Sequence, residues 1–167
     1  HQETLFHDWG LSAVDPHGAR SVLNFYGPPG TGKSMCAEAI ASYMGKPIIK
    51  VNYADLESKY VGETPKNIEG AFEAAREQDA VIFFDEADSI LGKRLSSVTQ
   101  GADHSVNLSR SVMLLAMDRF DGVVLFATNL AQNYDEAFVR RIQSHIRFEL
   151  PDLEAREKIC AYMLVER

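Results

Sequence analysis

The stretch GPPGTGKS (residues 27–34) is the most informative part of the sequence, and it directly follows the apolar run VLNFY (22–26). A glycine-rich turn between a strand and a helix lets backbone N–H groups approach phosphate oxygens, and the helix N-terminus adds positive potential. The spacing matches the P-loop pattern GxxxxGK(S/T). We therefore expect ATP or ADP to bind at this turn together with Mg²⁺. The predicted contact residues are Gly27, Pro28, Pro29, Gly30, Thr31, Gly32, Lys33, Ser34 and Met35.

Lys33 and Ser34 give the turn its chemistry. The lysine supplies a full charge to the β- and γ-phosphates, and the serine hydroxyl is a ligand for Mg²⁺. A glycine- and proline-containing turn that happens to precede a helix is the alternative. Nucleotide binding is favoured because the strand, the spacing, the lysine and the serine occur together.

A second acidic element, VIFFDEAD (81–88), consists of an apolar run that ends in adjacent carboxylates. Asp85 is placed to hold Mg²⁺ through water, and Glu86 is placed to polarise an attacking water. An acidic loop after a core strand is the alternative. Open α/β sheets bind ligands at the carboxyl edge of their strands, so a P-loop at the same edge favours the catalytic interpretation.

Five β-like runs alternate with helical stretches, which predicts an α/β three-layer P-loop sandwich with a mostly parallel sheet. The runs are 22–26, 47–51, 80–84, 123–127 and 145–149. The first, third and fourth are almost continuously apolar, as central parallel strands are. The second and fifth are mixed and suit the sheet edges. In the fifth, Ile146, Phe148 and Leu150 alternate with polar residues.

Helical periodicity fills the intervals between these runs. One helix is expected from Lys33 to about Met44, and another after Thr64 as N-cap with Pro65 in its first turn. Within 104–119, the residues Leu108, Val112 and Leu115 fall on one face, and a last helix begins near Asp152. The stretch 92–107 is polar, contains glycine and serine, and predicts a loop.

The bulk composition limits the class of protein. A chain of 167 residues fits one domain, and its net charge of −7 argues against a main task of gripping nucleic-acid backbone. No apolar run reaches the roughly 20 residues of a membrane span, and the N-terminus lacks both a signal peptide pattern and an initiator Met. We expect a piece of a longer protein. Cys36 and Cys160 are far apart in the sequence, so we expect no structural disulfide. This expectation fits a reducing, cytoplasmic setting.

The letters DEAD (85–88) suggest the DEAD-box RNA helicases, but those enzymes need a second domain and further signatures, and this chain is short and acidic. The motifs GPPGTGKS, VIFFDEAD, FATN (126–129) and DEAFVRRI (135–142) instead resemble, in this order, an AAA ATPase. The resemblance covers nearly the whole chain from about Val22. It implies five parallel strands in the order 5-1-4-3-2.

The same resemblance implies a division of the chain. Residues 1–21 would be a lead-in segment, 22–151 the AAA ATPase core, and 152–167 the start of a helix leading toward a helical lid that these residues do not include.

Three further residues acquire roles from the resemblance. Asn129 resembles the family's sensor-1 residue, which hydrogen-bonds the γ-phosphate or the attacking water; an asparagine at a strand end is otherwise a common turn former. Arg140 and Arg141 resemble arginine fingers that reach a neighbouring subunit's nucleotide; two adjacent arginines otherwise indicate a solvated face. Phosphoryl transfer needs additional positive charge, which favours the finger interpretation. The compact spacing from Arg141 to Pro151 resembles the katanin–spastin type.

The segment SKYVGE (58–63) also falls on a family position. Many ring-forming members carry an aromatic–hydrophobic–glycine triplet there that faces the central pore, and Tyr60, Val61 and Gly62 match it. A tyrosine folded back on the domain surface is the alternative. Lys93 and Arg94, in the stretch 92–107, occupy the region of a second pore loop.

Three functions remain open from the sequence. The first is a Mg²⁺-dependent ATPase motor in a homo-oligomer, expected to be a hexamer, that remodels polypeptide substrates without contacting a membrane. The second is an AAA-type loader or initiator on nucleic acid, and the third is a P-loop kinase. The Tyr60–Gly62 triplet and the acidic balance favour the first. Glu86, Asn129 and the two arginines disfavour the kinase because they serve water attack in an oligomer.

Overall fold

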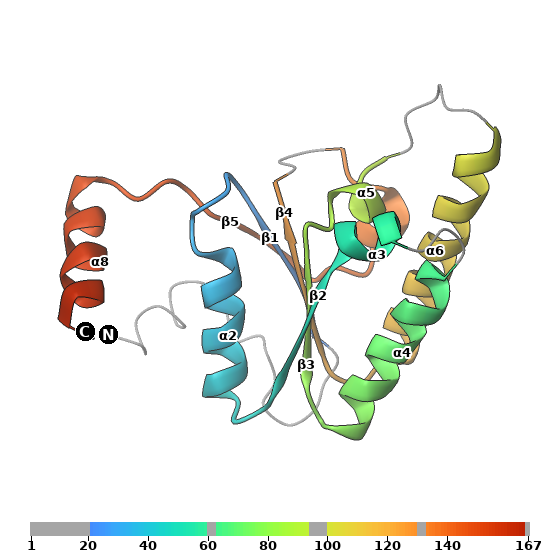
Figure 1. Ribbon diagram of the computed structural model, residues 1–167, viewed down its shortest axis with the longest axis horizontal. Coiled ribbons are helices and arrows are strands. Elements are labelled where there is room, and N and C mark those ends of the chain that lie inside the picture. The colour runs from blue at the N-terminus through green and yellow to red at the C-terminus, as the bar shows by residue number, and fades with distance from the viewer. Residues whose placement is uncertain (1–20, 60–62, 94–99, 130–132, 166–167) are drawn as a thin grey trace.

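The computed structural model describes residues 21–59, 63–93, 100–129 and 133–165. Its centre is one sheet of parallel strands in the order β2-β3-β4-β1-β5 (Figure 1). The strands are β1 (Ser21–Tyr26), β2 (Ile48–Asn52), β3 (Val81–Asp85), β4 (Val123–Thr128) and β5 (Ser144–Arg147). This order confirms the predicted arrangement 5-1-4-3-2, read from the other edge. Burial follows the same order, because β1, β3 and β4 are covered on both faces whereas β2 and β5 are partly exposed.

Helices cover both faces of the sheet. In Figure 1, α2 (Lys33–Tyr43) lies on one side, and α4 (Thr64–Glu77) and α6 (Gln100–Arg119) lie on the other. Shorter helices follow three strands near their carboxyl ends: α3 (Tyr53–Lys59), α5 (Asp88–Leu91) and α7 (Glu136–Val139). The last helix, α8 (Leu153–Val165), stands on the α2 side of the sheet. The molecule is therefore the three-layer α/β sandwich that the sequence predicts.

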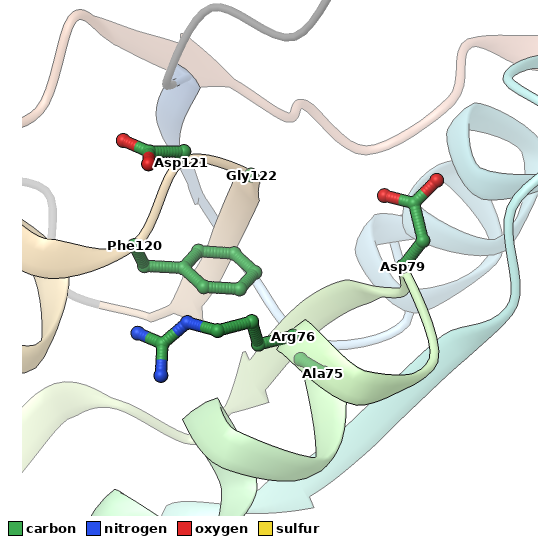
Figure 2. A pocket seen from close by; sticks show the side chains of 6 residues that line it. All are labelled: Ala75, Arg76, Asp79, Phe120, Asp121 and Gly122. Atoms are coloured by element: carbon green, nitrogen blue, oxygen red, sulfur yellow. The ribbon is translucent and has the colours of Figure 1, made fainter.

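The amino and carboxyl ends of the strands carry different kinds of residues. At the amino ends of β3 and β4, a small pocket lies between the ends of α4 and α6 (Figure 2). Its lining is Ala75, Arg76, Asp79, Phe120, Asp121 and Gly122. None of these residues belongs to the predicted nucleotide site. The carboxyl ends of the strands, at the opposite edge, carry the predicted phosphate and metal residues.

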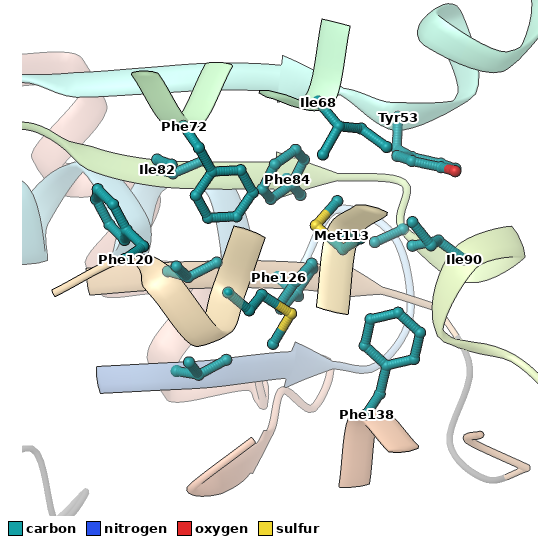
Figure 3. Close-up of a cluster of buried hydrophobic side chains, with 14 of the residues drawn as sticks. Tyr53, Ile68, Phe72, Ile82, Phe84, Ile90, Met113, Phe120, Phe126 and Phe138 are labelled. Atoms are coloured by element: carbon teal, nitrogen blue, oxygen red, sulfur yellow. The ribbon is translucent and has the colours of Figure 1, made fainter. Parts of the chain in front are cut away.

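The larger hydrophobic core lies between the sheet and the pair α4 and α6 (Figure 3). Aromatic rings form its centre. The ring centroid of Phe72 in α4 lies 5.7 Å from that of Phe84 in β3, and the Phe84 ring stacks on Phe126 of β4 with centroids 5.5 Å apart. A second cluster fills the space under α2. Each buried phenylalanine contributes about 2–3 kcal/mol of hydrophobic free energy. The core thus fixes the strands whose carboxyl ends carry the candidate site.

The prediction for 92–107 is wrong in its second half, because α6 begins at Gln100. The apolar face predicted for this helix is also wrong: Leu108 and Leu115 are 49% and 47% exposed, whereas Met113 and Met117 are fully buried. Residues four apart lie on one helix face, so burying the two methionines turns the leucines outward. The buried face also includes a charged residue, Arg110.

Smaller differences concern the element ends. Thr64 is the first residue of α4 rather than its N-cap, and its hydroxyl donates to the carbonyl of Leu56 at 3.1 Å. The predicted fifth strand is shorter than expected, since β5 ends at Arg147 and Leu150 is exposed. Phe148 is buried against Phe25, with ring centroids 5.2 Å apart. Among the described residues, no helix combines the length and the apolar character needed to cross a bilayer.

Candidate active site

Ser34 and Asp85, the two predicted Mg²⁺ ligands, lie next to each other. The serine hydroxyl in the first turn of α2 donates to the Asp85 carboxylate at the end of β3, at 3.0 Å. Hydroxyl and carboxylate oxygens are ligands that Mg²⁺ accepts. Within the described ranges no group of three or more His, Cys, Asp or Glu side chains gathers as a metal site. Ser34 and Asp85 therefore offer two neighbouring oxygen ligands that fit Mg²⁺.

The turn at residues 27–32, here called the phosphate turn, favours glycine at two positions. Gly27 has φ of 145°, and a Cβ built there would lie 2.0 Å from the carbonyl oxygen of Phe148. Gly32 has φ of 91° and forms the N-cap of α2. An L side chain rarely adopts such a φ, so both positions favour glycine. The Thr31 hydroxyl closes the turn by donating to the Pro28 carbonyl at 2.8 Å.

Lys33 lies inside the turn and is only 8% exposed. Its Nζ donates to the carbonyls of Gly27 at 2.7 Å and Pro28 at 2.9 Å, and to Oδ1 of Asn129 at 3.3 Å. Burial lowers the pKa of this ammonium, while the charges of Asp85 and Asp88 raise it. A phosphate oxygen would offer the ammonium an anionic partner in place of neutral carbonyls. The geometry also brings Asn129, at the end of β4, to the lysine.

Glu86 has an unusual backbone conformation. Its φ is 53°, in the left-handed region that few non-glycine residues adopt, and its N–H donates to Oδ1 of Asp85 at 2.9 Å. Such outliers cost about 1–3 kcal/mol and concentrate at functional sites. The residue itself is exposed at the carboxyl edge of the sheet, beside the Asp85 carboxylate.

Asp88 is a site residue to which the sequence analysis gave no role. Its Oδ1 accepts hydrogen bonds from the Thr128 hydroxyl and, at 2.8 Å, from the backbone N–H of Asn129. The carboxylate therefore links the start of α5 to the end of β4, next to Asn129, the predicted sensor-1 residue. In the sequence, the position of Asp88 as the last residue of the acidic motif DEAD (85–88) is the feature that could have indicated this role.

The structure distinguishes the two arginines that the sequence analysis treated alike. Arg140 follows α7 with its side chain 80% exposed, 4.0 Å from the carboxylate of Glu136. Arg141 is held by Asp118 of α6 through Nε at 2.9 Å and Nη2 at 2.7 Å. This bidentate hydrogen bond raises the pKa of Arg141. Both arginines thus contact α6 or α7 rather than the phosphate turn of their own chain.

Of the remaining predicted site residues, some lie within the described residues and others lie outside them. Met35 is exposed in the first turn of α2. The pore-loop residues Tyr60, Val61 and Gly62 lie outside the described residues, as does Arg94. The backbone N–H of Lys93 donates to the carbonyl of Asn133 at 2.6 Å, which ties the segment after α5 to the segment before α7.

The model of the ATPase family associated with various cellular activities (AAA) matches residues 23–150. The chain belongs to this family. The match spans the phosphate turn, the Asp85–Asp88 carboxylates, Asn129 and the arginine pair. The molecule is thus an AAA ATPase domain.

Related proteins agree with this assignment. The AAA domain is 43% identical over 144 residues to the "26S proteasome regulatory subunit 7 homolog" of Schizosaccharomyces pombe, covering 82% of this chain and 33% of the relative. It is 40% identical over 141 residues to the "Proteasome-activating nucleotidase" of Methanocella arvoryzae, covering 80% and 34%. The chain therefore spans about a third of the length of these curated relatives.

A solved structure shows the same fold. The FIGL-1 AAA domain in complex with ADP superimposes with a TM-score of 0.73 at 32% identity, covering 88% of this chain and 49% of that one. The fold of this AAA domain is thus shared with a domain of known structure, at an identity that supports relatedness as well as fold.

Proposed function

We propose that this AAA domain binds ATP with Mg²⁺ and transfers its γ-phosphoryl group to water. The observation that carries the proposal is the convergence of three sheet segments: Lys33 after β1, Asp85 at the end of β3, and Asn129 after β4. Lys33 and the backbone of the turn hold the phosphates. Ser34 and Asp85 would hold Mg²⁺, which neutralises charge on the β- and γ-phosphates.

Two side chains handle the water in this proposal. Glu86 accepts a proton as the water oxygen bonds to the γ-phosphorus, and the bond between that phosphorus and the oxygen bridging to the β-phosphate breaks to leave ADP. Asn129 orients the water or the γ-phosphate with its side-chain amide. Asp88 keeps Asn129 at the end of β4 through the backbone bond at 2.8 Å.

The arginines supply positive charge across a subunit boundary. We infer a homo-oligomeric ring, expected to be a hexamer, in which Arg140 and Arg141 reach the nucleotide of the next subunit. The 80% exposure of the Arg140 side chain supports this inference for Arg140, since a group that acts on another subunit has to be accessible in its own. Arg141 would have to leave its pair with Asp118 to do the same. An arginine in trans can contribute a factor of about 10³ or more to phosphoryl transfer.

The substrate we propose is polypeptide, gripped by Tyr60, Val61 and Gly62. The names of the relatives in S. pombe and M. arvoryzae refer to the proteasome, which supports a protein substrate. The net charge of −7 disfavours nucleic acid. The free thiol of Cys36 agrees with a cytoplasmic location.

Substrate-stimulated turnover of the full-length protein tests this function. Denatured polypeptide should raise ATP turnover and single- or double-stranded DNA should not. Tyr60→Ala should remove the stimulation by polypeptide and leave basal turnover within about 3-fold, because an aromatic side chain grips apolar groups without taking part in hydrolysis. Stimulation by DNA alone would favour the loader. Phosphate appearing on an added acceptor instead of in solution would favour the kinase.

A further inference from the structure

Arg110 is a buried cation that the proposed function does not use. It lies in α6, is 7% exposed, and its neighbours on the same helix face, Met113 and Met117, are apolar. Removing a guanidinium from water is costly unless carbonyl or carboxylate oxygens surround it. An apolar side chain would fill this position at a lower cost, so the partners of Arg110 indicate why a charge is present.

The first partners belong to the helix that follows the catalytic carboxylates. Nη2 of Arg110 donates to the carbonyl of Ser89 at 2.8 Å and to the carbonyl of Gly92. These carbonyls belong to α5 and its C-cap. The same helix starts at Asp88, which binds the backbone of Asn129. Only three residues thus separate Asp88, which contacts Asn129, from Gly92, whose carbonyl accepts from Arg110.

The other partner belongs to the segment that carries the arginines. Nη1 of Arg110 lies 3.5 Å from Oδ2 of Asp135, while Oδ1 of Asp135 caps α7 by accepting from the N–H of Ala137 at 2.9 Å. The backbone adds a further tie, because the N–H of Asp135 donates to the carbonyl of Leu91 at 2.8 Å. Arg110 therefore joins the end of α5 to the beginning of α7.

The far end of the same segment is held by the same helix. Asp118, two turns beyond Arg110 on α6, binds Arg141 in a bidentate pair. A cation of α6 thus holds the start of the α7 segment, and an anion of α6 holds its end. Arg140 lies between these two attachments, and its side chain is 80% exposed.

We propose that Arg110 is a positioning residue for the arginines that act on the neighbouring subunit. It fixes α7 against α5, so the place at which Arg140 is presented depends on the position of the Asp85–Asp88 carboxylates in the same subunit. A guanidinium suits this role because its planar fork can bind carbonyls and a carboxylate at once, which an ammonium cannot do in the same geometry. The inference rests on the proposed function, since it presumes that Arg140 acts in trans.

Subunit mixing with the full-length oligomer tests the proposal. Arg110→Met keeps the length of the side chain and removes the charge, and Arg119→Met on the exposed face of α6 is the matched control. Arg110→Met should reduce turnover at least about 10-fold with nucleotide affinity within about 3-fold, because the arginine is displaced while the phosphate turn is intact. Arg110→Lys should recover part of this loss, and Arg119→Met should behave as the unmodified protein.

The decisive measurement mixes Arg110→Met subunits with Glu86→Gln subunits. In an equal random mixture about a quarter of the interfaces join an intact active site to a correctly held arginine, since ring interfaces are heterologous. Activity above the sum of the two separate variants is the expected result. If Arg110 served only its own active site, both kinds of subunit would lack a working site and no activity would return, which would overturn the proposal.

Two further variants keep the outcome interpretable. Asp135→Asn retains the cap of α7 and loses the charge, so it decides the question in the same mixture if Arg110→Met fails to fold. Arg140→Ala mixed with Glu86→Gln tests the proposed function alone. Recovery with Arg140→Ala but not with Arg110→Met would overturn only the positioning role. Failure of both would overturn action in trans and this inference with it.

Discussion

The hydroxyl of Ser34 donates to Oδ2 of Asp85 at 3.0 Å, although the two residues are 51 positions apart in the sequence. The contact exists because the parallel order β3-β4-β1 places the ends of two apolar strands at one edge of the sheet. It joins the phosphate turn to the carboxylates through the protein's own atoms. The two halves of the candidate site are therefore held together by the fold, and their roles in binding and in chemistry can be tested separately.

Lys33→Ala and Glu86→Gln should separate binding from hydrolysis. Removing the lysine charge should weaken ATP binding about 10- to 100-fold, the value of a charge-assisted hydrogen bond or two. Replacing the glutamate by its amide keeps the shape but removes the base, so ATP should bind within about 3-fold of the unmodified protein while turnover falls at least about 100-fold. Calorimetric titration and phosphate release measure the two quantities. Equal loss of affinity in both variants would contradict the assigned roles.

Asp88→Ala should impair hydrolysis without removing binding. The substitution leaves the backbone N–H of Asn129 and the Thr128 hydroxyl without the carboxylate that they now contact. We expect turnover to fall about 10- to 100-fold, because a displacement of a positioning group by about an ångström can cost this much. Nucleotide affinity should change less than turnover. Asp121→Ala, at the opposite edge of the sheet, is the control and should leave both quantities unchanged.

The pair Asp118–Arg141 should stabilise the domain, whereas the exposed pair Glu136–Arg140 should not. A double-mutant cycle for Asp118→Ala and Arg141→Ala, measured by urea unfolding, should give a coupling of about 1 kcal/mol, at the upper end for a half-exposed pair because the contact is bidentate. The cycle for Glu136 and Arg140, whose side chains are 79% and 80% exposed, should give a coupling near zero. High salt should reduce the first coupling. Identical couplings in the two cycles would contradict this distinction.

Cys36 should react slowly with alkylating reagents in the folded chain. Burial raises the pKa of its thiol from 9.0 to about 11. At pH 8 the thiolate fraction is then about 100-fold lower than in the unfolded chain, and the thiolate is the reactive form. Mass spectrometry of a Cys160→Ser variant with iodoacetamide measures the rate, with the urea-unfolded variant as reference. Equal rates in the folded and unfolded chains would show that the thiol is not buried.

The same pKa has a consequence for stability. A folded-state pKa above the unfolded value means that the unfolded chain ionises first as the pH rises. The stability contribution of the neutral Cys36 thiol is therefore constant below about pH 9 and declines between about pH 9 and 11. Cys36→Ala should flatten this part of the stability profile, if unfolding is followed at pH 8, 9 and 10.

The arrangement of the sheet, and the strand, turn and helix that form the candidate phosphate site, could be predicted from the sequence alone. The run 22–26 followed by GPPGTGKS requires a strand, a tight turn and a helix, because the chemistry of those elements is local: apolar residues on both strand faces, glycines at positive φ, and a lysine at the helix start. The contrast between apolar and mixed runs was sufficient to assign central and edge strands. These features depend on residues close together in the chain.

Long-range packing, which the sequence does not reveal, determines which face of α6 is buried and how the arginines are held. Local periodicity is satisfied either by the leucines or by the methionines of α6, and the neighbouring Phe72, Phe84 and Phe120 rings decide for the methionines. The pairs Arg110–Asp135 and Asp118–Arg141 join residues 25 and 23 positions apart, whose approach depends on the packing of α6 against the sheet. A charge in a sequence does not reveal its partner, because the interaction depends on distance and burial rather than on spacing along the chain.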